Sequence, residues 1–139
     1  MKKISIGFII LLVIYLANVC IANDKIYPID KIELDCIAKT TGNTNAMNKC
    51  SMDAQTAWEN EIKKSLDELK GILDYEDYKI LLESQKTWEN YKQKNFEFTD
   101  LTPKYKEGTM FLNAKQGFRT GLIKQRALNL KEYINTLNF

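Results

Sequence analysis

Few residues of this chain are able to do acid–base or nucleophilic chemistry, because its 139 residues include no histidine. This absence excludes Ser-His and Cys-His nucleophile pairs and removes the commonest zinc ligand. Glycoside hydrolysis would need two carboxylates across a cleft, which a helical sequence alone cannot place. We interpret the following carboxylates as surface or ion-paired residues: Glu59, Glu61, Glu83 and Glu89. We expect no catalytic residue, no metal ligand and no cofactor.

Two of the three cysteines are expected to form a disulfide. Cys36 and Cys50 remain after the processing described below, and an exported chain meets an oxidising compartment. Closing a loop of about 15 residues would stabilise the fold by roughly 3 kcal/mol. The alternative is two independent reactive thiols, which is disfavoured because neither cysteine lies in a CxxC motif or beside a histidine.

The N-terminal residues have the pattern of a signal peptide. Lys2 and Lys3 precede an uncharged run over residues 4–22 that ends in Cys20-Ile21-Ala22. We expect residues 1–22 to be removed, leaving one domain over residues 23–139 that is periplasmic or secreted, without stable membrane insertion. Two alternatives stay open. The run is just long enough for a retained anchor, and Cys20 would carry a lipid if the branched Val19 were tolerated before it.

The charge of the mature chain excludes one class of partner. Without Lys2 and Lys3, the 20 basic residues become 18, equal to the 18 acidic residues. A formally neutral chain has no electrostatic footprint for nucleic acid, so we expect no nucleic-acid partner.

The elements that must position these residues are helices. The apolar residues recur at spacings of three and four, and no alternating run is long enough for a strand. The first long helix is predicted over residues 44–73. Asp74 is placed to cap a second helix that ends before Thr99-Asp100-Leu101-Thr102-Pro103, and a third helix follows Gly108. We predict an all-α, elongated antiparallel three-helix bundle with a disulfide-tied N-terminal arm, in which a short helix over residues 32–38 is left open.

The inner faces follow from the same spacing. The second helix is predicted to bury Tyr78, Leu81, Leu82, Gln85, Trp88, Tyr91 and Phe96. The third is predicted to bury Phe111, Ala114, Phe118, Leu122, Gln125, Leu130, Ile134 and Leu137.

A set of short motifs carries a family resemblance over nearly the whole mature chain. The motifs are Asp35-Cys36, Met47-Asn48-Lys49-Cys50, Gln85-Lys86-Thr87-Trp88, Gly108-Thr109 and the run from Lys124 to Leu130. In this order and spacing they resemble the LprI-type lysozyme-inhibitor family of small exported bacterial helical proteins. The resemblance implies a protein that binds a lysozyme and is not an enzyme.

The departures from the family pattern lead to further predictions. Similar proteins continue Gln-x-x-Trp with Arg-Asp and then a cysteine, where this chain has Lys92, Gln93 and Phe96. The partner cysteine of such proteins corresponds to Phe118. We therefore expect an aromatic contact between Phe96 and Phe118 in place of a second disulfide.

The remaining motif residues are expected to be structural. Gln85 and Trp88 share one helix face, where a tryptophan usually packs in the core. Arg126 also points inward in the predicted register and is expected to pair with Glu59, which stands where relatives often have Asp.

Two classes of function remain. The first is an inhibitor that occupies the cleft of a lysozyme. The alternative is an envelope structural or interaction module, or a secreted factor directed at a host, with no lysozyme binding. An inhibitor needs a protruding contact element. The best candidate is the loop over residues 99–109, with Asp100, Lys104, Lys106 and Glu107, and the second is the acidic turn with Asp74, Glu76 and Asp77.

Overall fold

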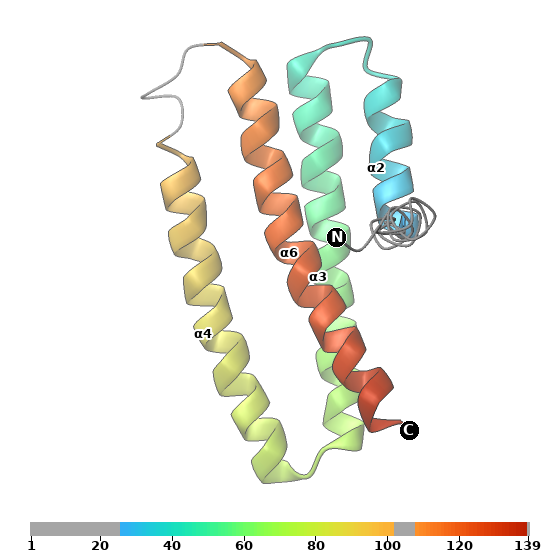
Figure 1. The fold of residues 1–139 in the computed structure, drawn as a ribbon, viewed down its shortest axis with the longest axis vertical. Coiled ribbons are helices and arrows are strands. Elements are labelled where there is room, and N and C mark those ends of the chain that lie inside the picture. Colours follow the sequence, from blue (N-terminus) through green and yellow to red (C-terminus); the bar gives the residue numbers. More distant parts are fainter. Residues whose placement is uncertain (1–25, 102–107, 139) are drawn as a thin grey trace, which may run out of the picture.

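The described residues of the computed structural model are 26–101 and 108–138, and they form four helices (Figure 1). These are α2 (Pro28–Ala38), α3 (Thr44–Ile72), α4 (Tyr75–Thr99) and α6 (Met110–Leu137). The all-α class is thereby confirmed. The predicted count of three is not, because the N-terminal arm is itself helical. The expected signal peptide, its cleavage site and Cys20 lie outside the described residues.

Local capping explains why the arm forms a helix and where it begins. Pro28 occupies the first turn, where its fixed φ suits a helix and its missing N–H costs nothing. The backbone N–H of Tyr27 donates to the Asp30 carboxylate at 3.1 Å, which closes the first turn. Helix α2 therefore begins at Pro28, four residues before the short helix that the sequence analysis left open over residues 32–38.

Side-chain caps set the N-terminal ends of the two long helices α3 and α4. Asn43 accepts a hydrogen bond from the Ala46 N–H at 3.0 Å, and Asp74 accepts one from the Asp77 N–H at 3.0 Å. The predicted capping role of Asp74 is confirmed. Before α3 the chain turns through Gly42, whose φ of +83° is accessible to glycine without strain.

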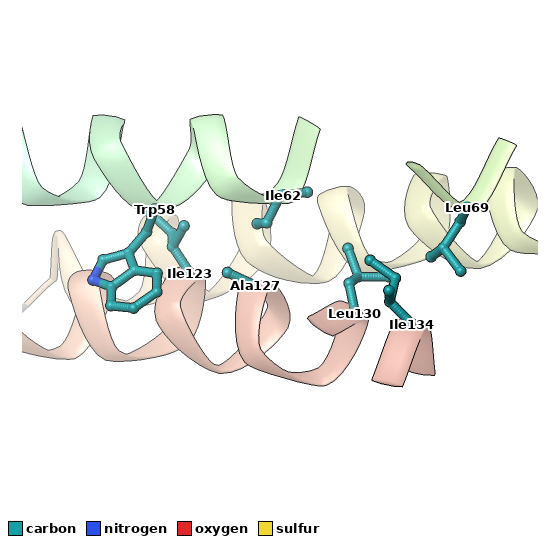
Figure 2. Packing of buried hydrophobic residues seen from close by; sticks show 7 residues of the cluster. All are labelled: Trp58, Ile62, Leu69, Ile123, Ala127, Leu130 and Ile134. Carbon is teal, nitrogen blue, oxygen red and sulfur yellow. The ribbon is translucent and has the colours of Figure 1, made fainter. Parts of the chain in front are cut away.

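The core lies mainly between α3 and α6, which run side by side along the molecule (Figures 1 and 2). Figure 2 shows its seven central residues: Trp58, Ile62, Leu69, Ile123, Ala127, Leu130 and Ile134. On α6 the buried positions start at Thr120 and then alternate in steps of three and four. Their contacts bury one continuous strip of each helix.

The predicted inner face of α6 is partly wrong. Leu130 and Ile134 are buried as expected, but Ala114, Phe118, Gln125 and Leu137 are exposed. Helix α6 carries apolar residues on two faces, and the sequence analysis treated both sets as one buried face. Burial selects the face with Ile123 and Ala127, because that face fits against Trp58 and Ile62 of α3.

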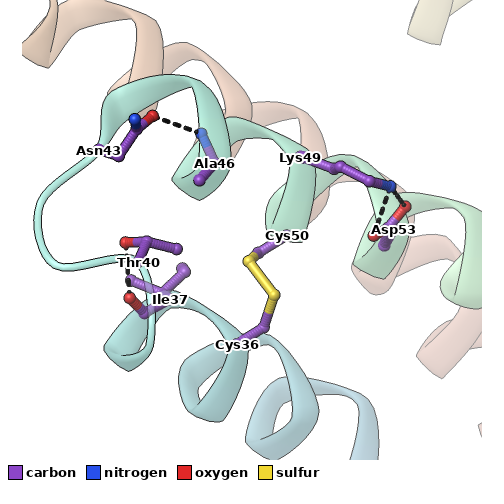
Figure 3. The surroundings of a disulfide bond; sticks show 8 residues. All are labelled: Cys36, Ile37, Thr40, Asn43, Ala46, Lys49, Cys50 and Asp53. Atoms are coloured by element: carbon purple, nitrogen blue, oxygen red, sulfur yellow. Dashed lines mark hydrogen bonds and ion pairs between the residues drawn. A yellow bond between two sulfur atoms is a disulfide. The ribbon is translucent and has the colours of Figure 1, made fainter.

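The disulfide between Cys36 and Cys50 is present and joins α2 to α3 (Figure 3). The two Cα atoms are 5.8 Å apart, and Cys50 is buried. The start of α2 is held at a second place, where Lys124 of α6 binds Asp30 at 2.7 Å. The arm is therefore fixed at both of its ends, to α3 and to α6.

Helix α4 is the least buried of the long helices. Among its residues, all of which are described, only Gln85 is buried, while Leu81, Trp88 and Phe96 are half-buried and pack against the core. Leu82 and Tyr91, predicted to face inward, are exposed. Polar contacts therefore make a large part of the attachment of α4.

Candidate functional site

Family motif residues of two helices, α4 and α6, come together to form what we call the motif cluster. Gln85 and Trp88 lie on α4, and Arg126 reaches them from α6. The Arg126 Nε donates a hydrogen bond to the Gln85 Oε1 at 2.9 Å, and the guanidinium carbon lies 5.9 Å from the centre of a Trp88 ring. The sequence predicted a shared face for Gln85 and Trp88 but not their contact with Arg126, which the structure reveals.

The predicted pair between Arg126 and Glu59 is not formed. Glu59 of α3 instead accepts from the Lys92 Nζ at 2.8 Å, and the same ammonium lies 5.3 Å from the centre of a Trp88 ring. Lys92 lies one turn after Trp88 on α4 and so reaches α3 directly. The sequence signal for this contact is the basic residue Lys92, one helical turn after Trp88.

Burial changes the electrostatics of Arg126. The pKa of its guanidinium is lowered because burial removes water from the charged group, and Tyr133 acts weakly in the opposite direction. Its Nη2 is buried and has no hydrogen-bond partner among the described residues. Gln85 is held in turn by Glu89, which accepts from its Nε2 at 3.3 Å.

The hollow next to this cluster is small. Its volume is about 160 Å³, and it is lined by residues of α3 and α4 that include Glu59, Gln85, Trp88 and Lys92. Pockets for small organic ligands usually measure about 300–1,000 Å³. We therefore assign the motif cluster to the attachment of α4 to its neighbours.

The carboxylates considered for catalysis are surface or paired groups. Glu59 binds Lys92, Glu61 binds Lys131, and Glu83 is exposed. In the described residues, no group of three or more cysteines and carboxylates is arranged to hold a metal ion. Across residues 26–101 and 108–138, no helix is both long and apolar enough to cross a bilayer.

The acidic turn lies at one end of the molecule, where α3 passes into α4 (Figure 1). Asp74, Glu76 and Asp77 are all exposed, and so is Tyr75 between them, at 78%. The Asp74 carboxylate caps α4, as described above. Glu76 and Asp77, in the first turn of the helix, remain exposed to a partner.

The other candidate contact element lies at the far end of α4. Asp100 accepts from Lys115 at 3.1 Å and from the Arg119 Nη2 at 2.8 Å. These two bonds from α6 lower the pKa of the Asp100 carboxyl group. Lys104, Lys106 and Glu107 lie outside the described residues.

The two elements cannot belong to one small contact surface. Helix α4 separates them, and its 25 residues span about 37 Å. Asp100 is already engaged by two cations, whereas Glu76 and Asp77 are exposed at a chain reversal. The geometry therefore favours the acidic turn over Asp100 as a contact for a basic partner.

The predicted aromatic pair between Phe96 and Phe118 is not among the ring contacts of the described residues, and Phe118 is 72% exposed. Phe96 packs under Arg119 instead, whose guanidinium carbon lies 4.5 Å from the ring centre. The Arg119 Nη2 also donates to the Phe96 carbonyl oxygen at 2.7 Å. Arg119 thus joins α4 to α6 where the sequence suggested two aromatic rings.

A search of curated proteins finds no match. The crystal structure of an uncharacterized protein from Burkholderia thailandensis is similar, with a TM-score of 0.74 and 21% sequence identity. The match covers 83% of this chain and 57% of that one, so this chain spans little more than half the length of that protein. At this identity the likeness shows the fold alone.

A match to a family model identifies the family of the chain. The model described as "Lysozyme inhibitor LprI" matches residues 36–130, which is more than half of the chain. The match begins at the first disulfide cysteine and ends at a core residue of α6, so it includes α3, α4 and the motif cluster of Gln85, Trp88 and Arg126. The chain belongs to the LprI lysozyme inhibitor family.

Proposed function

We propose that this protein is an exported inhibitor that binds a lysozyme and blocks its substrate cleft, without chemistry of its own. The observation that carries the proposal is the family match over residues 36–130. The missing histidine and the paired state of Glu59 and Glu61 agree with a binding role.

The acidic turn is the contact element that the geometry favours. It joins two long helices at one end of the molecule (Figure 1), where a partner can reach its exposed side chains. Tyr75 is exposed there, and tyrosine is enriched among residues that dominate binding energy. Glu76 and Asp77 add two negative charges that attract a basic lysozyme surface.

The proposed function also requires that the protein is exported. Residues 1–22 would act as a cleaved signal peptide, and residues 23–139 would form the periplasmic or secreted domain. The disulfide between Cys36 and Cys50 supports exposure to an oxidising compartment. Mass spectrometry of the exported protein should find an N-terminus near Asn23. An intact Met1 segment or a lipid on Cys20 would refute the cleavage.

The binding surface is tested with charge reversal at the turn. Binding of a basic lysozyme to the exported, oxidised protein is measured at low and high salt. Glu76→Lys combined with Asp77→Lys should slow association by tenfold or more, roughly the range of electrostatic steering, and should reduce its salt dependence. Asp74 stays unchanged, because its loss would remove the cap of α4.

The matched control reverses two exposed carboxylates away from the turn. Asp35→Lys with Glu83→Lys changes the net charge by the same amount on α2 and in the middle of α4. This variant should keep nearly the full association rate. If both variants lost the same share of the association rate, the turn would not be the contact element. If the wild-type protein did not bind, the alternative of an interaction module without lysozyme binding would be favoured.

A further inference from the structure

The outward face of α6 carries no charge for about five helical turns. Every exposed residue of α6 from Met110 to Asn129 is uncharged, and most are small or apolar: Met110, Ala114, Gly117, Phe118, Gly121, Gln125 and Asn129. Their spacings of three, four and one place them on one side of the helix. We call this face the α6 stripe. It lies opposite to the buried Ile123, Ala127 and Leu130.

The basic residues of the same segment are all turned away from the stripe. They form hydrogen bonds or ion pairs with groups on α2, on α4 and at the end of α4, and none of them is fully exposed: Lys115, Arg119, Lys124 and Arg126. The outer face of a helix in a soluble monomer normally carries charged residues. An uncharged face of this length indicates a surface that another molecule covers.

An apolar groove adjoins the stripe between α4 and α6. Its volume is about 420 Å³, and Phe96, Phe98, Phe118 and Leu122 form much of its lining. Phe98 and Phe118 are 71% and 72% exposed, so two aromatic rings project beside the groove. Arg119 fixes the groove wall through its bonds to Phe96 and Asp100. The groove is therefore formed before any partner arrives.

A projecting ring and a groove that can receive it lie on the same face. Such a face is self-complementary about a two-fold axis, the arrangement of the commonest oligomers. We propose that two copies of this chain pair through their α6 stripes in antiparallel orientation, with Phe118 of each copy seated in the groove of the other. A lysozyme recognised by charge would find no opposite charge here.

Two glycines support a close approach of the two helices. Apart from the adjoining residues and backbone of α6 itself, no heavy atom of the described residues lies within 4 Å of a Cβ placed at Gly117 or Gly121. Each lowers the helix propensity of α6, and no described residue fills the space that it leaves. A two-fold axis between them sets Gly117 of one copy opposite Gly121 of the second.

The available area predicts a weak dimer. The stripe is about 30 Å long and about 10 Å wide, and the groove with Phe98 extends it to several hundred Å² on each copy. A standard stable interface buries about 800 Å² per partner. We therefore expect dissociation in the micromolar range or above, at concentrations that sedimentation can reach.

The test is sedimentation of the exported, oxidised protein from about 1 to 500 µM, a range that brackets a micromolar dissociation constant. The wild-type mass should rise from monomer to dimer. Phe118→Ser should raise the dimer dissociation constant roughly 30-fold or more, the effect of losing a central aromatic anchor. Tyr133→Ser, an exposed aromatic of the same helix outside the stripe, should leave the constant unchanged.

A second variant separates association from folding. Gly121→Gln adds a better helix former in open space, so it should raise the melting temperature of the dilute monomer while weakening the dimer. A wild-type protein that stays monomeric at 500 µM overturns the proposal. Equal dimerisation of the Phe118→Ser and Tyr133→Ser variants also overturns it. No lysozyme is present, so the result is independent of the proposed inhibition.

Discussion

Gln85 joins the outer helix α4 to α6 through a single buried side chain. It is 6% exposed, and its Oε1 accepts from the Arg126 Nε. Gln85→Leu should lower the free energy of unfolding by about 1–3 kcal/mol, because a buried guanidinium N–H loses its acceptor. Urea unfolding measures this loss, and Gln93→Leu at an exposed position of the same helix is the control.

A double variant distinguishes the bond from simple packing. If the Gln85–Arg126 contact is responsible, Gln85→Leu and Arg126→Leu should cost less together than the sum of their separate costs, because each single variant leaves the other partner unpaired and the double variant does not. Additive losses would contradict the assigned role of the contact.

At the residue scale, the sequence did not predict the ion-pair partner of Glu59. Helical spacing predicted that Gln85 and Trp88 share one face and that Arg126 points inward, but it did not predict that Arg126 meets the other two. The partner of Glu59 was not predictable, because two cations on two neighbouring helices could reach it. The crossing of α3 and α4 decides between them, and it brings Lys92 to 2.8 Å.

At the scale of elements, the disulfide fixes α2 on α3. Replacing both cysteines with alanine should lower the free energy of unfolding by about 3 kcal/mol, through the entropy that the unfolded chain regains. The loss is measured by urea unfolding of the oxidised wild-type and variant proteins. After reduction of the wild-type disulfide, the two proteins should have similar midpoints; a large remaining difference would show that packing at Cys50 dominates.

The end of α4 is held on α6 by a pH-dependent contact. The Asp100 carboxyl group has a pKa below its ordinary value because Arg119 and Lys115 bind its charged form. Its contribution to stability is therefore full above the unfolded pKa of about 3.9 and is lost as the pH falls through the lower folded pKa. The group is exposed, so the effect is small.

A comparison with Asp100→Asn isolates this contribution. The stability difference between the wild-type and variant proteins should be constant from pH 7 down to about pH 5, then shrink on further acidification. Urea midpoints along the pH series provide the measurement. A difference that stays constant to pH 2 would mean that the Asp100 charge contributes nothing.

The elements themselves were largely predictable because their boundaries carry capping residues. Asp74 identified the start of α4, and the first long helix was placed within one residue of α3. The register of α6 was not predictable from periodicity, since apolar residues occupy both its core face and the α6 stripe. Only the fit against Trp58 and Ile62 selects the buried face.

For the whole molecule, the sequence predicted the class and the family more securely than the contact surface. The family model and the all-helical structure agree with both of those predictions. The surface depends on which charges are already engaged, and this requires the positions of all the helices. Asp100 is paired across α4 and α6, whereas Glu76 and Asp77 are exposed at the opposite end.

Turnover of cell-wall substrate by a basic lysozyme tests the central claim most directly. The exported, oxidised protein is titrated into the reaction at several substrate concentrations. Cleft occupation predicts that turnover falls with increasing protein and recovers with increasing substrate, and that the Glu76→Lys/Asp77→Lys variant inhibits less than the Asp35→Lys/Glu83→Lys control. Turnover that is unchanged by an excess of the wild-type protein would contradict inhibition of that lysozyme, and the same result across lysozyme types would contradict the proposed function.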